Sequence, residues 1–178
     1  MTQIAIDFKK YIRSVEDHPN PGITFYDITT LILDPEGFRL SVDALEESVR
    51  AWNPDKLLAV ESRGFVFAAA LADRLGLGTA LARKPGKLPG ETISAEYELE
   101  YGHDKLELHR DAIGDGERVV VVDDLIATGG TLKASCQLVE KLGGEVVGIA
   151  SVVELSFLPW REKLEGYNVT FLVSYDSE

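Results

Sequence analysis

The stretch VVVVDDLIATGGTL at residues 119–132 constrains the fold more than any other part of this 178-residue chain. Four valines in a row are typical of a strand buried on both faces, as in a parallel sheet. Asp123 and Asp124 follow at the carboxyl end of that strand, the edge where open α/β sheets bind ligands. The ATGGT segment then begins a helix, and its glycines let backbone N–H groups converge on an anion. The stretch therefore predicts a site for a sugar phosphate.

Each part of the motif suits such a ligand. Two adjacent like charges are costly unless a ligand uses them, and vicinal sugar hydroxyls can donate to both carboxylates. Gly129 and Gly130 allow close backbone approach, and Thr128 and Thr131 add hydroxyl donors near the positive end of the helix. The patterns GxxxxGK[ST] and GxGxxG after a strand are absent, which disfavours a nucleotide triphosphatase or a dinucleotide enzyme. The alternative is a tight turn whose aspartates only cap the helix.

Composition excludes several classes of protein. A hydrophobic content of 45% suits one domain with a sizeable core. The formal charge of −12 argues against a nucleic-acid or anionic-membrane partner, because phosphates would be repelled. A single cysteine, Cys136, excludes an intrachain disulfide, and its place in an expected helix indicates a buried structural thiol. The N-terminal segment lacks an apolar signal core and no apolar run could span a membrane, so we expect a cytoplasmic protein.

Strands and helices alternate along the chain, which predicts an α/β fold with a mostly parallel sheet. Hydrophobic periodicity predicts helices at 2–17, 38–52, 65–75, 131–142 and 159–164. Buried strands are expected at 56–60, 79–83, 118–123, 146–155 and 168–175. The Pro- and Gly-rich segment 84–92 is expected to be a mobile surface loop, and the alternation at 94–110 predicts a β-hairpin.

Several motifs resemble one family. DDLIATGGT at 123–131 is similar to the phosphoribosyl-pyrophosphate motif of the type I phosphoribosyltransferases. ESRGF at 61–65, RKPGKLPGET at 83–92 and YELEYG at 97–102 resemble motifs of the adenine phosphoribosyltransferases within that group. PNPGITFYDIT at 19–29 is similar to their base-binding hood segment. Four motifs agree with DDLIATGGT and stand in the right order, whereas DDxxATGGT alone would indicate only the superfamily.

The resemblance runs from about residue 10 to 165 and implies a fold and a reaction. The implied fold is the α/β type I phosphoribosyltransferase fold, a single domain at 1–178 with a mostly parallel central sheet flanked by helices. A hood lies mainly at 1–35, and a flexible loop or hairpin at about 84–105 covers the site. The implied reaction transfers the 5-phosphoribosyl group from phosphoribosyl pyrophosphate to adenine, giving AMP and pyrophosphate, with Mg²⁺.

The resemblance also assigns catalytic roles, to Glu100, Arg63, Asp123 and Asp124. Glu100 resembles the family's catalytic carboxylate, which holds the proton at adenine N7 so that the N9 lone pair can attack. Arg63 supplies a fork of donors for departing pyrophosphate. We expect Mg²⁺ to be held through the substrate and water, with both aspartates as candidate contacts and no direct side-chain ligand. The alternative for Glu100 is a glutamate that faces outward from a strand. The alternative for Arg63 is a surface arginine paired with a nearby acid.

Pyrophosphate-binding residues come from two loops. Glu61 and Ser62 belong to the loop that holds pyrophosphate, where the family often has a cis peptide, which we predict at Glu61–Ser62. Glu61 stands where relatives often carry Asp. In related enzymes Arg83 and Lys87 reach pyrophosphate across a dimer interface, so we expect a homodimer.

The resemblance places adenine between Phe25 and Leu125, with backbone groups of Thr24 and Tyr26 at its edge. Tyr26 replaces an arginine frequent in relatives, and Trp160 departs from the small residue typical there. Further substrate contacts are expected at Tyr101, Ala127, Thr128, Gly129, Gly130 and Thr131. Two alternatives stay open: a regulator that binds phosphoribosyl pyrophosphate without turnover, and a phosphoribosyltransferase for another purine base.

Overall fold

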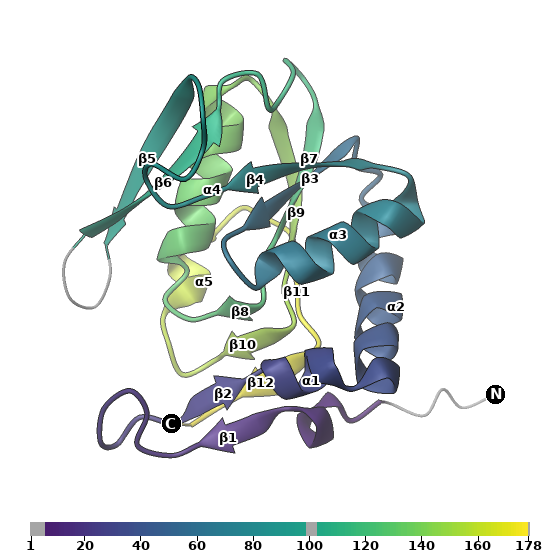
Figure 1. The fold of residues 1–178 in the computed structure, drawn as a ribbon, viewed down its shortest axis with the longest axis vertical. Coiled ribbons are helices and arrows are strands. Elements are labelled where there is room, and N and C mark those ends of the chain that lie inside the picture. The colour runs from purple at the N-terminus through teal and green to yellow at the C-terminus, as the bar shows by residue number, and fades with distance from the viewer. Residues whose placement is uncertain (1–5, 99–102, 178) are drawn as a thin grey trace.

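A central parallel sheet organises the protein, whose computed structural model describes residues 6–98 and 103–177 (Figure 1). Its strand order is β11-β9-β7-β3-β4, and every neighbouring pair is parallel. The strands are β3 (Lys56–Val60), β4 (Gly78–Ala82), β7 (Arg118–Val122), β9 (Glu145–Ala150) and β11 (Val169–Thr170). The expected α/β class with a parallel sheet is confirmed.

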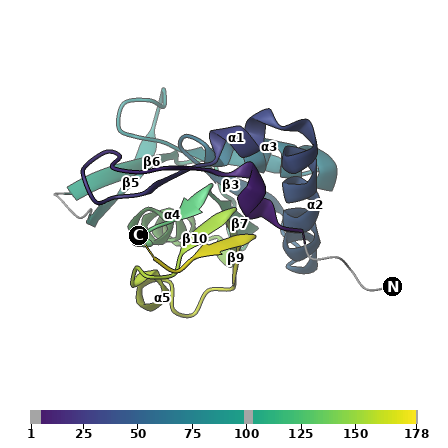
Figure 2. The same cartoon turned by 90° about the horizontal axis from the view of Figure 1, so that it is seen from below.

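The valine run of β7 is buried on both faces, as expected. Val120 and Val122 pack into the core beneath α2 (Pro35–Ala51) and α3 (Gly64–Leu75). Val119 and Val121 pack on the opposite side, with α4 (Gly130–Lys141) and α5 (Trp160–Lys163). Figure 2 shows the two pairs of helices on opposite faces of the sheet. Side chains alternate along a strand, so a continuous apolar run is what a sheet covered on both faces requires.

Three smaller β structures surround this sheet. The N-terminal strands β1 (Arg13–Val15) and β2 (Phe25–Asp27) pair antiparallel. A three-stranded parallel sheet contains β12 (Val173–Tyr175), β10 (Val153–Leu155) and β8 (Leu125–Ile126). The expected hairpin is confirmed as β5 (Thr92–Glu98) paired with β6 (His103–His109). Within 6–98 and 103–177, no helix is long and apolar enough to cross a membrane.

The expected N-terminal helix at 2–17 is wrong for the residues that the structure describes. The chain forms a short 3-10 helix, η1 (Phe8–Tyr11), and then enters β1. Thr30 of α1 (Thr29–Leu33) donates its hydroxyl to the Tyr11 carbonyl (2.6 Å) and accepts the Arg13 N–H (3.1 Å). These contacts and the pairing with β2 satisfy the backbone groups that a longer helix would use, so tertiary pairing overrides the amphipathic pattern.

The two single strands expected near the C-terminus are also wrong, because each divides into two strands in different sheets. After β9 the chain leaves the central sheet at Ser151, whose N–H donates to the Thr170 carbonyl (3.0 Å). The next two N–H groups, of Val152 and Val153, donate to the Asp124 carbonyl (3.2 and 3.0 Å). This turn places the small β8–β10–β12 sheet next to the two aspartates.

Cys136 is fully buried in α4, as expected for a structural thiol. Burial raises the pKa of its thiol to about 12, so the nucleophilic thiolate is disfavoured near neutral pH.

Candidate active site

Two strand ends bring the predicted acids and the predicted arginine together. β3 and β7 are parallel neighbours, with Ala59 opposite Val122, so the residues that follow them meet at one edge of the sheet. Asp123 and Asp124 follow β7, and each is only 7% exposed. Burial, and after it the neighbouring Asp124 charge, raises the pKa of Asp123 well above its usual range. A ligand that donates hydroxyl groups or brings positive charge would therefore relieve an unfavourable pair of carboxyl groups.

Arg63, from the loop after β3, provides the opposite charge. Its Nε lies 2.8 Å from Asp124 Oδ2. This contact is an ion pair without hydrogen-bond geometry, and among residues 6–98 and 103–177 that buried oxygen has no hydrogen-bond donor. Gly64 then packs so closely that a Cβ there would lie 2.7 Å from the Val122 carbonyl oxygen. The pairing of Arg63 with an acid, weighed as an alternative to a binding role, is thus a pairing with an acid of the predicted site itself.

The predicted cis peptide at Glu61–Ser62 is confirmed. Glu61 accepts hydrogen bonds from Arg83 Nε (3.3 Å) and Nη2 (3.2 Å) and from the Lys84 N–H (2.9 Å). Burial alone would raise the pKa of Glu61, but these donors together hold it below its usual value. Arg83 also donates to the Lys87 carbonyl (3.1 Å). Arg83 and Lys87 therefore lie beside the loop after β3, at residues 61–63 of their own chain, which we call the pyrophosphate-type loop. That they reach pyrophosphate in a partner's site stays a prediction.

The expected anion loop joins β8 to α4. Gly129 adopts a left-handed conformation (φ 77°, ψ −2°) and α4 begins at Gly130. Ala127 and Thr128 precede the turn and are half-buried, as is Thr131 in the first turn of the helix. A 12-residue helix presents unpaired N–H groups and the positive end of its dipole at this position. The loop can therefore receive a phosphate group, as the sequence predicts.

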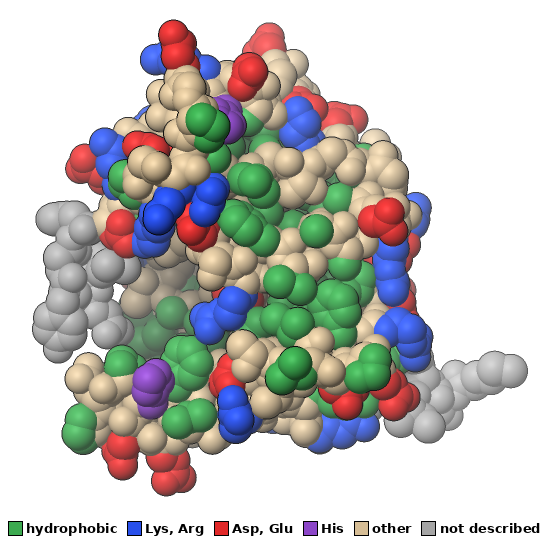
Figure 3. All heavy atoms as spheres, in the orientation of Figure 1, with side chains coloured by type: hydrophobic (Ala, Val, Ile, Leu, Met, Phe, Trp, Pro, Cys, Tyr) green, Lys and Arg blue, Asp and Glu red, His purple; other side chains and the backbone are tan. Residues whose placement is uncertain are grey.

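The hood strand β2 approaches this site through Phe25. The Arg63 guanidinium lies 5.6 Å from the Phe25 ring centroid, so one arginine touches both an acid of the site and the expected base-stacking ring. Leu125, the expected second wall, is half-buried in β8 directly after the acids. Figure 3 shows a hollow between the N-terminal strands and the β5–β6 hairpin, with Lys and Arg side chains along its upper edge.

Comparison with known proteins identifies the family. The family description "Phosphoribosyl transferase domain" matches residues 30–168. The chain is 53% identical to adenine phosphoribosyltransferase of Desulfitobacterium hafniense, over 96% of this chain and 99% of that one. This chain belongs to the adenine phosphoribosyltransferase family.

Solved structures of the family agree in fold. Adenine phosphoribosyltransferase from Thermoanaerobacter pseudethanolicus superposes with a TM-score of 0.91 at 50% identity, covering 94% of this chain and 98% of that chain. The Saccharomyces cerevisiae enzyme, solved with an imino-altritol bisphosphate and adenine, gives 0.87 at 40% identity and covers 93% and 96%. The type I phosphoribosyltransferase fold implied by the motifs is confirmed.

Trp160 is a site-forming residue to which the sequence assigned no role. Its side chain is buried, and its backbone and Cβ lie 3.2–3.4 Å from where a Gly129 Cβ would stand. The Arg161 guanidinium lies 4.3 Å from the indole centroid and pairs with buried Glu154 (2.9 Å). The backbone and Cβ of Trp160 therefore lie against Gly129 of the phosphate loop, while the indole packs in the core near Phe171. Because these atoms are backbone and Cβ, the large aromatic side chain does not make this contact, and no signal in the sequence indicates it.

Glu100 and Tyr101 lie outside the described residues, and their expected roles stay predictions. The strands that flank them are anchored by Lys84, whose ammonium group donates to the Tyr97 hydroxyl (2.9 Å) and pairs with Asp104. Lys84 is therefore not a freely solvated lysine, the alternative that its Pro- and Gly-rich loop suggests.

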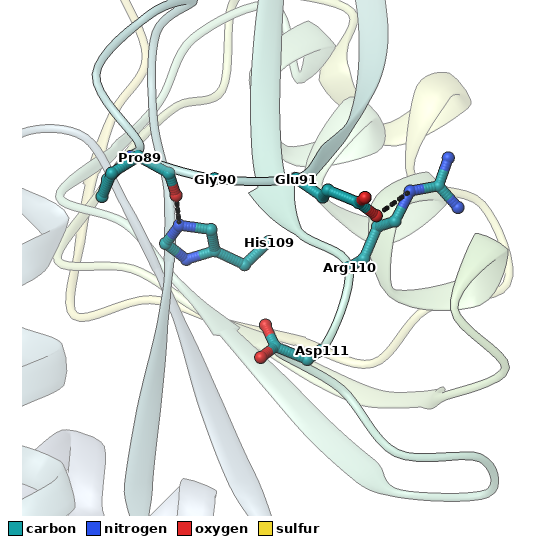
Figure 4. A pocket seen from close by; sticks show the side chains of 6 residues that line it. All are labelled: Pro89, Gly90, Glu91, His109, Arg110 and Asp111. Atoms are coloured by element: carbon teal, nitrogen blue, oxygen red, sulfur yellow. Dashed lines mark hydrogen bonds and ion pairs between the residues drawn. The ribbon is translucent and has the colours of Figure 1, made fainter.

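A separate cavity of about 390 Å³ lies where the 84–92 loop meets the end of β6 (Figure 4). Its lining residues come from these two segments and are Pro89, Gly90, Glu91, His109, Arg110 and Asp111. His109 contacts the Pro89 carbonyl (2.6 Å), and the Arg110–Glu91 pair (3.8 Å) is solvent-exposed. None of these lining residues belongs to the strand-end site, so we assign this cavity no part in binding the substrate.

Proposed function

We propose that the protein transfers the 5-phosphoribosyl group of phosphoribosyl pyrophosphate to adenine, giving AMP and pyrophosphate in purine salvage. One observation carries the proposal: the buried Asp123–Asp124 pair, the N-terminus of α4, Arg63 and Phe25 meet at one edge of the sheet. Carboxylates suit the ribose hydroxyls, helix N–H groups suit the phosphate, and the half-buried Phe25 ring suits the base.

The reaction breaks the bond between the anomeric carbon and a pyrophosphate oxygen, and the bonding electrons leave with pyrophosphate. The N9 lone pair of adenine forms the new bond, and the proton at N7 passes to Glu100. Arg63, Arg83 and Lys87 neutralise the leaving group. Asp123 and Asp124 hold the ribose hydroxyls and place negative charge below the positive sugar ring. Their fixed position at a strand end means that little reorganisation is needed during the reaction.

Mg²⁺ fits this site. Carboxylate oxygens are the ligands that this cation prefers, and Asp124 Oδ2 is buried without a hydrogen-bond donor in the part of the chain that the structure describes. Asp123 and Asp124 would hold the ion through water, and it would supply positive charge for the pyrophosphate oxygens. Within 6–98 and 103–177, no group of three or more His, Cys, Asp or Glu side chains forms a metal site.

Pyrophosphate release tests the proposal. The protein is incubated with phosphoribosyl pyrophosphate, Mg²⁺ and, in turn, adenine, hypoxanthine, guanine or xanthine. We expect pyrophosphate and AMP with adenine, and little product with the three 6-oxopurines. Binding of phosphoribosyl pyrophosphate without release would support the regulator, and faster release with another base would reassign the substrate.

We further propose a homodimer. Leu81 of β4 and Val66 of α3 are 40% and 38% exposed. Figure 3 shows hydrophobic side chains gathered over this region. Such exposed apolar surface is typical of an interface, and Arg83 follows β4 directly. Mixed dimers that carry an Arg83 variant in one protomer and a Glu100 variant in the other test for sites shared between protomers. Recovered activity is expected, whereas none would argue against shared sites.

The remaining expectations stay predictions. These are the cytoplasmic location, the single domain at 1–178 with its hood at 1–35, and mobility of the segment at about 84–105.

A further inference from the structure

An aromatic stack joins the hood to the C-terminal strand. The rings of Tyr26 and Tyr175 lie 3.6 Å apart between centroids, with an interplanar angle of 20°. Tyr26 is buried, and its hydroxyl donates to the Ser177 carbonyl (3.0 Å). Lys9 places its ammonium group 4.7 Å from the centroid of the Tyr175 ring. The proposed reaction uses none of these side-chain contacts.

The stack is directly connected to the base-stacking ring. Phe25 and Tyr26 are consecutive residues of β2, and successive side chains of a strand point to opposite faces. Phe25 contacts Arg63 on the site side, while Tyr26 contacts Tyr175 on the other. Any shift of Tyr26 on Tyr175 therefore moves the Phe25 ring.

Tyr175 is also connected to the opposite wall. In β12 it pairs with Leu155 of β10, and β10 pairs in turn with β8, where Val153 lies opposite Leu125. Figure 1 shows β2, β12, β10 and β8 in succession at the lower side of the molecule. The strand that bears Tyr175 and the strand that bears Leu125 are thus the two edges of one small sheet.

We propose that Tyr175 is a positioning residue for the purine base, acting through Tyr26 to set the separation of Phe25 from Leu125. The inference rests on the proposed function, in which adenine lies between these two walls. Dispersion contacts weaken steeply when a gap opens by a fraction of an ångström, so a fixed separation matters for a flat ligand. We assign phosphoribosyl pyrophosphate to the acids and to α4, which the two stacked rings reach only indirectly, through Phe25 and Arg63 and through β10. Tyr175 is therefore expected to affect binding of the base more than binding of the co-substrate.

Steady-state kinetics of Tyr175→Ala and Tyr175→Phe test this inference. Removal of the ring is expected to raise KM for adenine by about fivefold to tenfold, with KM for phosphoribosyl pyrophosphate changed less than about twofold. Tyr175→Phe keeps the ring and is expected to restore the adenine KM. Tyr167→Ala is the matched control, because Tyr167 is, like Tyr175, a half-buried tyrosine with a lysine over its ring, and it contacts Glu140 (2.7 Å) outside the hood. It is expected to leave both KM values unchanged.

The outcomes separate the possible explanations. An unchanged adenine KM in a folded Tyr175→Ala variant, or an equal rise in both KM values, would overturn the inference. If Tyr175→Ala does not fold, Tyr175→Leu gives the same comparison, because it keeps apolar bulk without a flat ring. Absence of adenine turnover by the unsubstituted enzyme would instead contradict the proposed function.

Discussion

Gly64→Ala is expected to damage both stability and activity through a single methyl group. Gly64 is the first residue of α3, directly after the pyrophosphate-type loop. A Cβ at this position would lie 2.7 Å from the Val122 carbonyl oxygen, 3.0 Å from Asp123 Cα and 3.1 Å from Asp123 Oδ1. Two of these three atoms are backbone, so a movement of the Asp123 side chain alone would not relieve the close contacts. The helix must move away from β7, or Asp123 must move.

Two opposing terms set the size of the effect on stability. The separation must increase by roughly 0.7 Å to reach an ordinary contact of 3.4 Å, and such overpacking costs about 1–3 kcal/mol. Replacing glycine by alanine also reduces the entropy of the unfolded chain, which is worth about 0.4–1 kcal/mol in the other direction. The overpacking term is larger, so we expect a net loss of about 1–2 kcal/mol. Because misplacement by ~1 Å at a reacting site can cost about 10²-fold, kcat/KM should fall by roughly 10- to 100-fold.

Urea unfolding at pH 7 and the pyrophosphate-release assay measure these two effects. Gly78→Ala is the matched control. Gly78 begins β4, its φ is not left-handed, and among residues 6–98 and 103–177 no atom beyond its chain neighbours lies within 4 Å of its built Cβ. At Gly78 only the reduced entropy of the unfolded chain changes stability. We therefore expect the free energy of unfolding to rise by about 0.5 kcal/mol and activity to stay unchanged. A Gly64→Ala variant as stable and active as Gly78→Ala would refute the reasoning from close contact.

Three further predictions concern other parts of the molecule. Glu100→Gln should lower kcat by roughly 10²- to 10⁴-fold in steady-state assays, and turnover near that of the unsubstituted enzyme would reject its catalytic role. Hydrogen bonds from Thr29, and then from Arg13, lower the pKa of Asp27 from 3.8 to about 2, so the carboxylate stabilises the fold above pH ~4 and this contribution is lost towards pH 2. Asp27→Asn should therefore cost about 2 kcal/mol in urea unfolding at pH 7 and less at pH 3, whereas a deficit independent of pH would contradict this assignment. Trp160→Ala should cost about 3–5 kcal/mol in the same assay but Trp160→Phe less than about 1.5, because its indole N–H has no partner among residues 6–98 and 103–177; equal losses would contradict this.

The elements that the sequence predicted well are those whose pattern is local and strong. The buried strand KLLAV, the helix that ends at Gly76 and the valine strand all lie where expected, within a residue or two. In each case the period of the apolar residues, the length of the run and the terminating residue agree. Gly76 indeed has the left-handed conformation that ends a helix.

The N-terminal segment shows why the rest could not be predicted. Phe8 and Ile12 do face the core, as their spacing indicates, but Arg13–Val15, within the expected helix, form strand β1. An amphipathic pattern specifies which residues are buried, whereas the partner strand β2 and the hydroxyl of Thr30 decide the backbone conformation. Neither partner is identifiable from the segment itself.

The sequence alone determined which chemical groups are available: two acids at a strand end, a glycine turn before a helix, an arginine after the neighbouring strand. Tertiary structure decided which of these groups touch. Arg63 pairs with Asp124 and Arg83 with Glu61, and the Tyr26 hydroxyl reaches the Ser177 carbonyl, 151 positions along the chain. The physical reason is that periodicity records only whether a side chain faces the core or solvent. The order of strands in the sheet, which no local pattern contains, sets the distances between residues far apart in sequence.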